Sequence, residues 1–138
     1  MILILGGNSN LYRALEPYLQ FQNPIFGIFE GRSLKKLNRT ALRDVVTLKP
    51  DGSNLEHVLS NHGICHVLNF TGIAHGSREQ LFAANVNLCQ TLIRNVVEKP
   101  LTWIEIGSFA IFKDGSFKEI LPVTNYGDSK ATQYRALE

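Results

Sequence analysis

The sequence predicts an α/β protein in three layers, with a mostly parallel sheet covered by helices on both faces. Short, unbroken apolar runs alternate along the chain with segments whose apolar residues recur at helical spacing. Glycine, serine or threonine follows several of these runs, which is typical of the ends of buried parallel strands. Right-handed crossovers would bring those strand ends to one edge of the sheet.

Five apolar runs predict the strands. The first run is aliphatic and stops at two glycines, and Pro24 suits the start of the second. The predicted strands cover residues 2–5, 25–29, 45–48, 66–70 and 101–106.

The helices are predicted between the strands, at residues 11–19, 34–42, 55–61 and 80–97, and a last helix opens at Asn125 or Asp128. Pro17 predicts a kink or an early stop in the first helix. Gly63 suits the carboxyl end of the third helix, and Pro100 ends the fourth. Residues 112–123 carry turn signals and are predicted to be irregular.

The bulk composition fits one globular domain over residues 1–138. The chain is 44% hydrophobic and carries a net charge of +2, which is too small to indicate a nucleic-acid or membrane partner. The first apolar run is too short for a signal peptide or a membrane span, so we expect a cytoplasmic protein. Cys65 and Cys89 lie in apolar stretches and are expected to be buried free thiols. The four histidines show no ligand spacing, so no metal site is predicted.

A glycine turn between the first strand and the first helix is where a dinucleotide pyrophosphate would dock, because backbone N–H groups at the start of a helix face the phosphates. The residues in this place are Gly6, Gly7, Ser9, Asn10 and Leu11. A turn with a purely structural role is the alternative interpretation.

The register of this turn can be argued from its apolar residues. A G-x-x-G-x-x-G loop that begins at Gly6 puts Leu15 where the helix needs an apolar residue, whereas a start at Gly7 puts Glu16 there. In the preferred register Ser9 and Tyr12 replace the second and third glycines. Tyr12 must then turn aside or push the helix outward, because the third glycine normally lets the helix pack closely.

The second predicted strand is followed by one acidic and one basic residue. Glu30 can accept hydrogen bonds from adenosine ribose hydroxyls, which favours NAD, and Arg32 can neutralise a 2′-phosphate, which favours NADP. The preference stays open, and a solvated loop is the alternative for either residue.

Tyr126 and Lys130 are four residues apart and would share one face of the last helix. A lysine ammonium near a tyrosine favours the phenolate, so the phenol could exchange a proton with a carbonyl or an alcohol. By itself the spacing also fits a solvated helix face.

Taken together, these motifs resemble the extended branch of the short-chain dehydrogenase/reductase superfamily, the NAD-dependent epimerases and dehydratases of nucleotide sugars. Residues 106–112 resemble the SSxxVYG segment of that branch and select Ser108. Residues 122–130 resemble its P-x-x-x-Y-x-x-S-K string, and Asn85 takes the position of the asparagine in its NVxGT element. Phe70, Thr71 and Gly72 occupy the strand end that lines the cofactor.

The resemblance implies a Rossmann-type doubly wound fold that binds NAD or NADP and is incomplete at its C-terminal end, where the substrate lobe of the family would follow. Ser108 would hold the substrate oxygen, Tyr126 would move the proton, and Lys130 would also bind the cofactor ribose. A nucleotide sugar is the implied substrate, and we expect a homo-oligomer that covers the open surface. The alternative is a catalytically degenerate module that binds a nucleotide or a protein partner.

Overall fold

The computed structural model describes residues 1–19, 23–32, 44–96, 98–112, 119–120 and 122–137. The chain forms two compact units. The first, called the sheet unit, comprises Met1–Phe70 and Arg94–Ile106. The second, called the helical unit, comprises Thr71–Ile93 and Gly107–Glu138.

The sheet unit contains five strands in the order β3-β2-β1-β4-β5. Every neighbouring pair is parallel, which confirms the predicted sheet. β4 and β5 are shorter than the predicted runs, although the N–H of Phe70 still donates to the Leu5 carbonyl at 2.9 Å. The strands are β1 (Ile2–Leu5), β2 (Ile25–Phe29), β3 (Val45–Leu48), β4 (His66–Asn69) and β5 (Thr102–Glu105).

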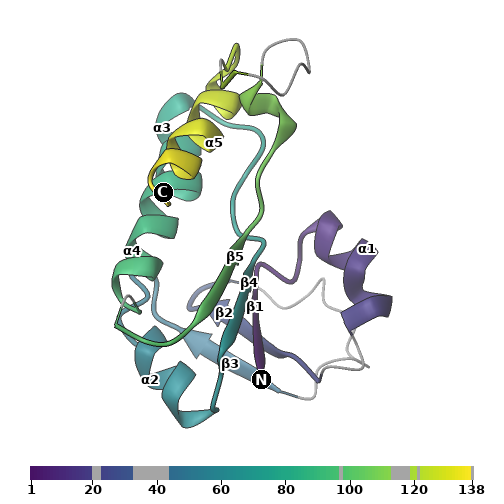
Figure 1. The fold of residues 1–138 in the computed structure, drawn as a ribbon, viewed down its shortest axis with the longest axis vertical. Helices are drawn as coiled ribbons and strands as arrows, with labels where there is room; N and C mark the ends of the chain where they lie inside the picture. The colour runs from purple at the N-terminus through teal and green to yellow at the C-terminus, as the bar shows by residue number, and fades with distance from the viewer. Residues whose placement is uncertain (20–22, 33–43, 97, 113–118, 121, 138) are drawn as a thin grey trace. The chain divides into compact units, whose positions relative to one another are not determined.

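β1 lies at the centre of the sheet and pairs with β2 on one edge and β4 on the other. The chain first runs outward through β2 to β3 and then crosses back to β4. Right-handed connections therefore put α1 (Asn10–Leu19) and α2 (Leu55–Asn61) on opposite faces of the sheet, as Figure 1 shows. This arrangement confirms the doubly wound, three-layer fold class. Ligands of such sheets bind where the strand order reverses, at the carboxyl ends of the strands.

Gly27 allows three strands to pack tightly in the centre of the sheet. A Cβ atom at this position would lie 2.6 Å from Cδ2 of Leu5 and 3.0 Å from Cδ1 of Leu48. Leu5 and Leu48 are themselves fully buried. The glycine is therefore explained by core packing, not by a turn.

The ends of α1 and α2, the helices that the described residues of this unit form, can be compared with the predictions. α2 closes as a Schellman motif, in which Gly63 adopts a φ of 59° and the N–H of Ile64 donates to the Leu59 carbonyl at 2.9 Å. This confirms the prediction for Gly63. α1 continues through Pro17 to Leu19, which confirms the predicted carboxyl end, so of the two alternatives for Pro17 the early stop is wrong and the kink stays a prediction. The predicted helix at 34–42 lies outside the described residues.

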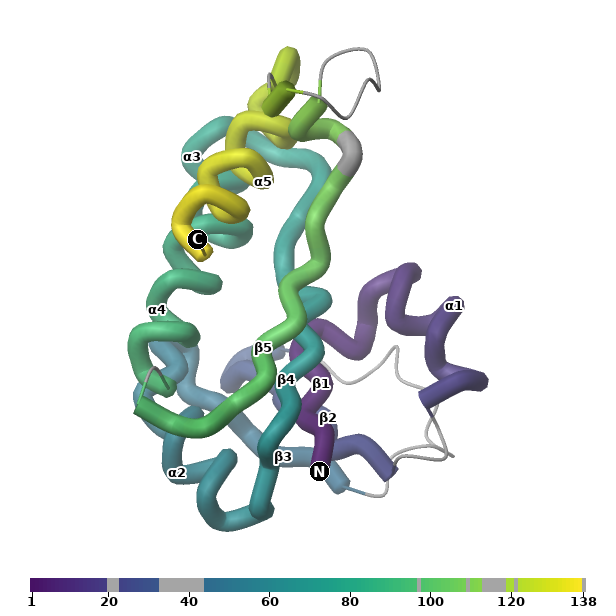
Figure 2. The backbone as a smooth tube through the Cα atoms, in the orientation of Figure 1, coloured from purple at the N-terminus to yellow at the C-terminus, as the bar shows by residue number. Residues whose placement is uncertain are grey.

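The helical unit contains a continuous helical run, which Figure 2 draws as a coiled tube from α3 to α4. α3 (Arg78–Phe82) passes into a π-helical turn (Ala83–Asn87) and then into α4 (Leu88–Arg94). The predicted helix over 80–97 is confirmed as a helical run, which begins earlier, at Arg78, ends earlier, at Arg94, and includes a π-helical turn that the sequence did not predict. The start is earlier because Ser77 and Gln80 form a capping box, in which each side chain accepts a hydrogen bond from the backbone N–H of the other.

The last helix, α5, spans Asn125–Arg135 and confirms the first of its two predicted starts. Thr124 caps it, with Oγ1 accepting from the N–H of Gly127 at 2.9 Å. A 3₁₀ turn (Phe109–Ile111) precedes it. Phe112 and Ile120 form an antiparallel bridge inside the segment that was predicted to be irregular.

The two cysteines differ in exposure. Cys89 is buried, as predicted, but Cys65 is exposed, so that part of the prediction is wrong. Cys65 lies just before β4, and its Sγ accepts a hydrogen bond from the amino terminus of Met1 at 3.3 Å. Among the described residues, no cluster of three or more His, Cys, Asp and Glu side chains could hold a metal ion. The same residues include no helix that is long and apolar enough to cross a membrane.

Candidate functional site

The turn after β1 forms the amino-terminal part of the site in the sheet unit. Gly6 adopts a φ of 73°, which favours glycine, and its carbonyl accepts from the N–H of Ser9 at 2.9 Å. Ser9 is the cap of α1, because its Oγ accepts from the N–H of Tyr12 at 3.0 Å. Asn10 and Leu11 begin the helix, where N–H groups have no intrahelical acceptor. These donors suit an anion such as a pyrophosphate.

Tyr12 occupies the place of the third glycine and points into the core. Its side chain is 2% exposed, and it packs with Ile4, Phe26 and Phe70. The ring meets Phe26 and Phe70 edge-on, at centroid distances of 5.4 and 5.8 Å. The tyrosine is therefore a spacer between α1 and the sheet. Burial, with a smaller contribution from Glu16, raises the pKa of Tyr12 to about 12.

The remaining predicted residues of the sheet unit lie at the exits of β2 and β4. Glu30 and Arg32 are exposed on either side of Gly31, whose φ is 76°. The N–H of Arg32 donates to the Phe29 carbonyl at 3.0 Å and closes this turn. Phe70 lies at the end of β4 with its ring in the core, so it could reach a ligand only through its main chain.

In the helical unit, Asn85 holds the Thr71–Ile73 segment by two hydrogen bonds. Its Oδ1 accepts from the N–H of Ile73 at 2.8 Å, and its Nδ2 donates to the carbonyl of Ile73 at 3.0 Å. Gly72 adopts a φ of 131°, and a Cβ there would lie 2.6 Å from Asn85 Oδ1. Thr71 and Gly72, two of the predicted cofactor contacts, therefore have their backbone fixed by a buried amide.

Ser108 begins the turn that packs against α5. Its Oγ accepts from the N–H of Ala110 at 3.2 Å, which leaves the hydroxyl hydrogen able to donate to a bound oxygen. The 3₁₀ turn that follows contacts α5. The contact is closest at Gly127, where a Cβ would lie only 2.2 Å from the Ala110 carbonyl oxygen. This glycine lets the Ser108 turn approach the residue next to Tyr126.

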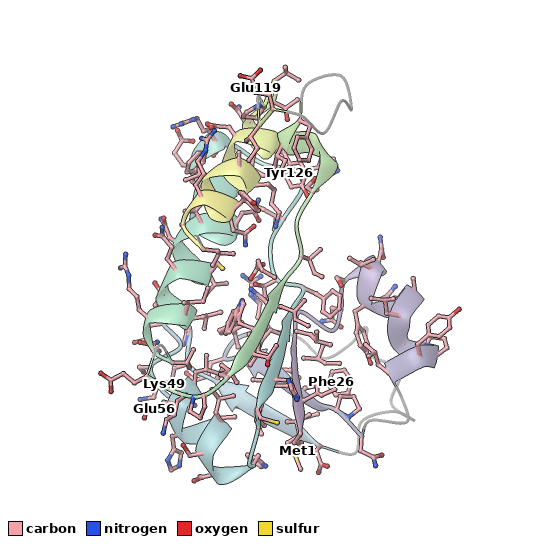
Figure 3. All side chains as sticks on the ribbon, viewed as in Figure 1. Met1, Phe26, Lys49, Glu56, Glu119 and Tyr126 are labelled. Carbon is pink, nitrogen blue, oxygen red and sulfur yellow. The ribbon has the colours of Figure 1, made fainter. Side chains whose placement is uncertain are left out.

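Tyr126 and Lys130 lie on α5, one helical turn apart. Tyr126 is half-buried in the first turn of the helix, where Figure 3 labels it. Lys130 is buried, and its Nζ donates to Oε1 of Gln133, which is also buried. Because an amide is neutral, this bond holds the ammonium group without neutralising it.

Sequence reasoning assigned no role to three residues of α5, Gly127, Ser129 and Gln133, although Ser129 is the serine of the Y-x-x-S-K string. Gln133 has a usable signal, because a side chain three residues from Lys130 lies on the same helix face. Sequence reasoning also missed a hydrogen-bonded cluster around Glu105 in the sheet unit. There, Oε2 of Glu105 accepts from Asn69 Nδ2 at 2.7 Å and from Trp103 Nε1 at 3.0 Å.

Each unit thus assembles its own share of the predicted residues. The helical unit holds Thr71, Gly72, Asn85, Ser108, Tyr126 and Lys130. The sheet unit holds Gly6, Gly7, Ser9, Asn10, Leu11, Glu30, Arg32 and Phe70.

The fold is shared with solved structures of dinucleotide-bound enzymes. UDP-glucuronic acid 4-epimerase from Bacillus cereus, in complex with NAD, matches with a TM-score of 0.80 at 13% identity, over 99% of this chain and 50% of its own. UDP-glucose 4-epimerase from Brucella ovis, in complex with NAD, matches with a TM-score of 0.79 at 18% identity, over 99% of this chain and 46% of its own. A short-chain dehydrogenase/reductase superfamily protein from Agrobacterium tumefaciens, with bound NAD, matches with a TM-score of 0.67 at 19% identity, over 99% and 44%.

These likenesses show that the chain has a Rossmann-type fold of the kind found in nucleotide-sugar epimerases. The chain spans about half the length of the structures it matches. No protein-family model matches the sequence, and no curated protein matches it.

The raised pKa of Tyr12 predicts a loss of stability in alkaline solution. The unfolded phenol ionises near 10 and the folded one near 12, so the unfolded state binds fewer protons between these values. The contribution of the buried Tyr12 phenol to the free energy of unfolding is complete below pH 10 and is lost as pH rises through 12. Urea unfolding at pH 9 and pH 11 should show a steeper fall in the free energy of unfolding for the wild type than for Tyr12→Phe. Equal slopes would contradict this account.

Gly127→Ala should destabilise the protein even though alanine is the better helix former. Helix propensity alone predicts a gain of about 1 kcal/mol. The clash of the new Cβ with the Ala110 carbonyl oxygen predicts a loss of about 1–3 kcal/mol in the free energy of unfolding. Neither atom can move away unless the backbone that carries it moves too. Gly107→Ala is the control, since a Cβ there meets nothing within 4 Å. Thermal unfolding of both variants decides the sign.

Proposed function

We propose that this chain is the cofactor-binding part of an NAD(P)-dependent enzyme that epimerises, dehydrates or reduces a nucleotide-linked sugar. The observation that carries the proposal is the close contact between the Ser108 turn and the first turn of α5. This helix carries both Tyr126, in its first turn, and Lys130, one turn later. The matched structures include NAD complexes of UDP-sugar epimerases. Because the chain spans about half of them, the activity is proposed for the whole protein.

The predicted residues of each unit suit a different part of the nucleotide cofactor. The turn at Gly6 and the first N–H groups of α1 suit the pyrophosphate, because they offer backbone donors at the positive end of a helix. Lys130 would donate to the ribose, and the backbone of Thr71 and Gly72 would line the cofactor. Bound NAD(P) supplies a hydride acceptor and donor. Glu30 and Arg32 leave the choice between NAD and NADP open.

The proton is proposed to move through Tyr126. The Ser108 hydroxyl would donate a hydrogen bond to the reacting oxygen of the sugar and orient it toward the phenol. Tyr126 would take the hydroxyl proton as the sugar is oxidised and return it on reduction. The cytoplasmic location and the homo-oligomer remain predictions of the sequence.

Tyr126→Phe in the full-length protein should abolish turnover while sparing cofactor binding. Losing a general acid or base costs about 10²–10⁴-fold in rate, whereas the phenol hydroxyl is not proposed to hold the cofactor. The measurements are turnover of UDP-glucose and UDP-glucuronic acid, and calorimetric titration with NAD. Tyr134→Phe is the matched control, because Tyr134 lies on the same helix with 46% of its surface exposed. Activity in Tyr126→Phe equal to that of the control would remove the proposed role.

A catalytically degenerate module is the second candidate. Two observations favour it: Ser9 uses a first-turn donor of α1 for its own cap, and the Tyr12 ring occupies the third glycine position. Both reduce the resemblance of the turn to a pyrophosphate cradle.

Calorimetric titration of the folded full-length protein with NAD, NADH, NADP and NADPH separates the two candidates. The enzyme proposal expects saturable binding of at least one of the four. A protein that shows cooperative unfolding but binds none of them would support the degenerate module.

A further inference from the structure

Two buried side chains connect the Thr71–Ile73 segment to the helix that carries Tyr126. Nδ2 of Asn85 donates to the Ile73 carbonyl and also to Oγ of Ser129, each at 3.0 Å. Ser129 Oγ donates in turn to the main-chain carbonyl of Tyr126 at 2.8 Å. Asn85 is 1% exposed and Ser129 is 0% exposed. Bulk water therefore does not compete for these hydrogen bonds.

The direction of each bond is fixed by the donors available. An asparagine amide has two N–H hydrogens, and Ile73 and Ser129 take both of them. The serine hydroxyl has one hydrogen, which goes to the Tyr126 carbonyl, so its oxygen must accept from Asn85. If Ile73 moves, the side chains of Asn85 and Ser129 must move with it. Otherwise a buried polar group loses its hydrogen bond, which costs free energy.

The hydrogen bonds from Asn85 through Ser129 end at the first turn of α5, which has further contacts of its own. The backbone of Gly127 lies against the Ala110 carbonyl, and its N–H donates to the Thr124 cap. A side-chain hydroxyl bonded to a carbonyl in the preceding turn also adjusts local helix geometry. The main chain of Tyr126 is thus set between the Ser108 turn and the Asn85–Ser129 pair.

We propose that Ser129 is a positioning residue, which acts with Asn85 to couple the Thr71–Ile73 segment to the placement of Tyr126. This inference rests on the proposed function, which puts the cofactor against Thr71 and Gly72. In this proposal, cofactor binding at that segment restricts the motion of Ile73. Because Asn85 and Ser129 are hydrogen-bonded between Ile73 and Tyr126, the first turn of α5 is then restricted as well. Ser129 itself touches neither cofactor nor substrate in this scheme.

The kinetic test uses the full-length protein and turnover of UDP-glucose or UDP-glucuronic acid. Ser129→Ala should lower kcat about 10- to 100-fold, the range expected for a misplaced reacting group, with little change in KM. Ser129→Thr keeps the hydroxyl and should recover most of kcat. Ala131→Gly is the control, because it weakens the same helix without touching the hydrogen bonds. The proposal is overturned if Ser129→Ala keeps more than half of kcat, or if Ala131→Gly loses as much.

A second measurement is independent of turnover. In the wild type, NAD should slow hydrogen exchange both at Thr71–Ile73 and at Tyr126–Lys130. Ser129→Ala should keep the first protection and lose the second, and retention of both would overturn the coupling. Coupled protection in a protein without turnover would preserve the coupling and reject the proposed activity. Failure of the folded wild type to bind any of NAD, NADH, NADP and NADPH would overturn both.

Discussion

The sheet unit depends on one four-residue strand that is hydrogen-bonded along both edges. β1 is flanked by β2 and β4 in parallel register, so Leu5 stands opposite both Gly27 and Asn69. This pairing aligns the exits of three strands, and with them the Gly6 turn, Glu30 and the end of β4. It also sets the reversal of strand order that places α1 and α2 on opposite faces. A slip of one residue would turn the apolar side chains of β1 to the wrong faces.

The helical unit buries polar side chains, Asn85 and Ser129 among them, beside apolar ones such as Leu81 and Leu92. Asn85 lies in a π-helical turn, a feature that often occurs at functional sites because it re-aims a side chain from a regular helix. Its amide fixes the Ile73 backbone, and the absence of a side chain at Gly72 provides the room for it. At Gly127 the missing Cβ allows a second close approach. Two glycines and one amide therefore fix the Thr71–Ile73 segment and the contact between the Ser108 turn and the first turn of α5.

Much of this architecture could be predicted from the sequence, because strands buried on both faces leave uninterrupted apolar runs such as residues 2–5 and 45–48. The capping of α2 by Gly63 was equally readable from local chemistry. The π turn at Ala83–Asn87 could not be predicted, since its apolar spacing resembles that of a regular helix. The role of Ser129 was missed because it depends on Asn85, which is distant in sequence, whereas the partner of Gln133 lies on the same helix and was simply overlooked. Tyr12 was identified as an anomaly, but its place in the core requires Phe26 and Phe70, which are distant in sequence.

The difference between the two cysteines gives the molecule a natural chemical handle. Cys65 is exposed and Cys89 is buried, so a thiol reagent applied to the native protein should modify the first in preference to the second. Cys65 lies at the amino edge of the sheet, beside the amino terminus, whereas the Gly6 turn lies at the carboxyl edge of the same strands. A fluorophore attached there would label the protein at the opposite edge of the sheet from the Gly6 turn, and so without blocking a ligand's approach to that turn.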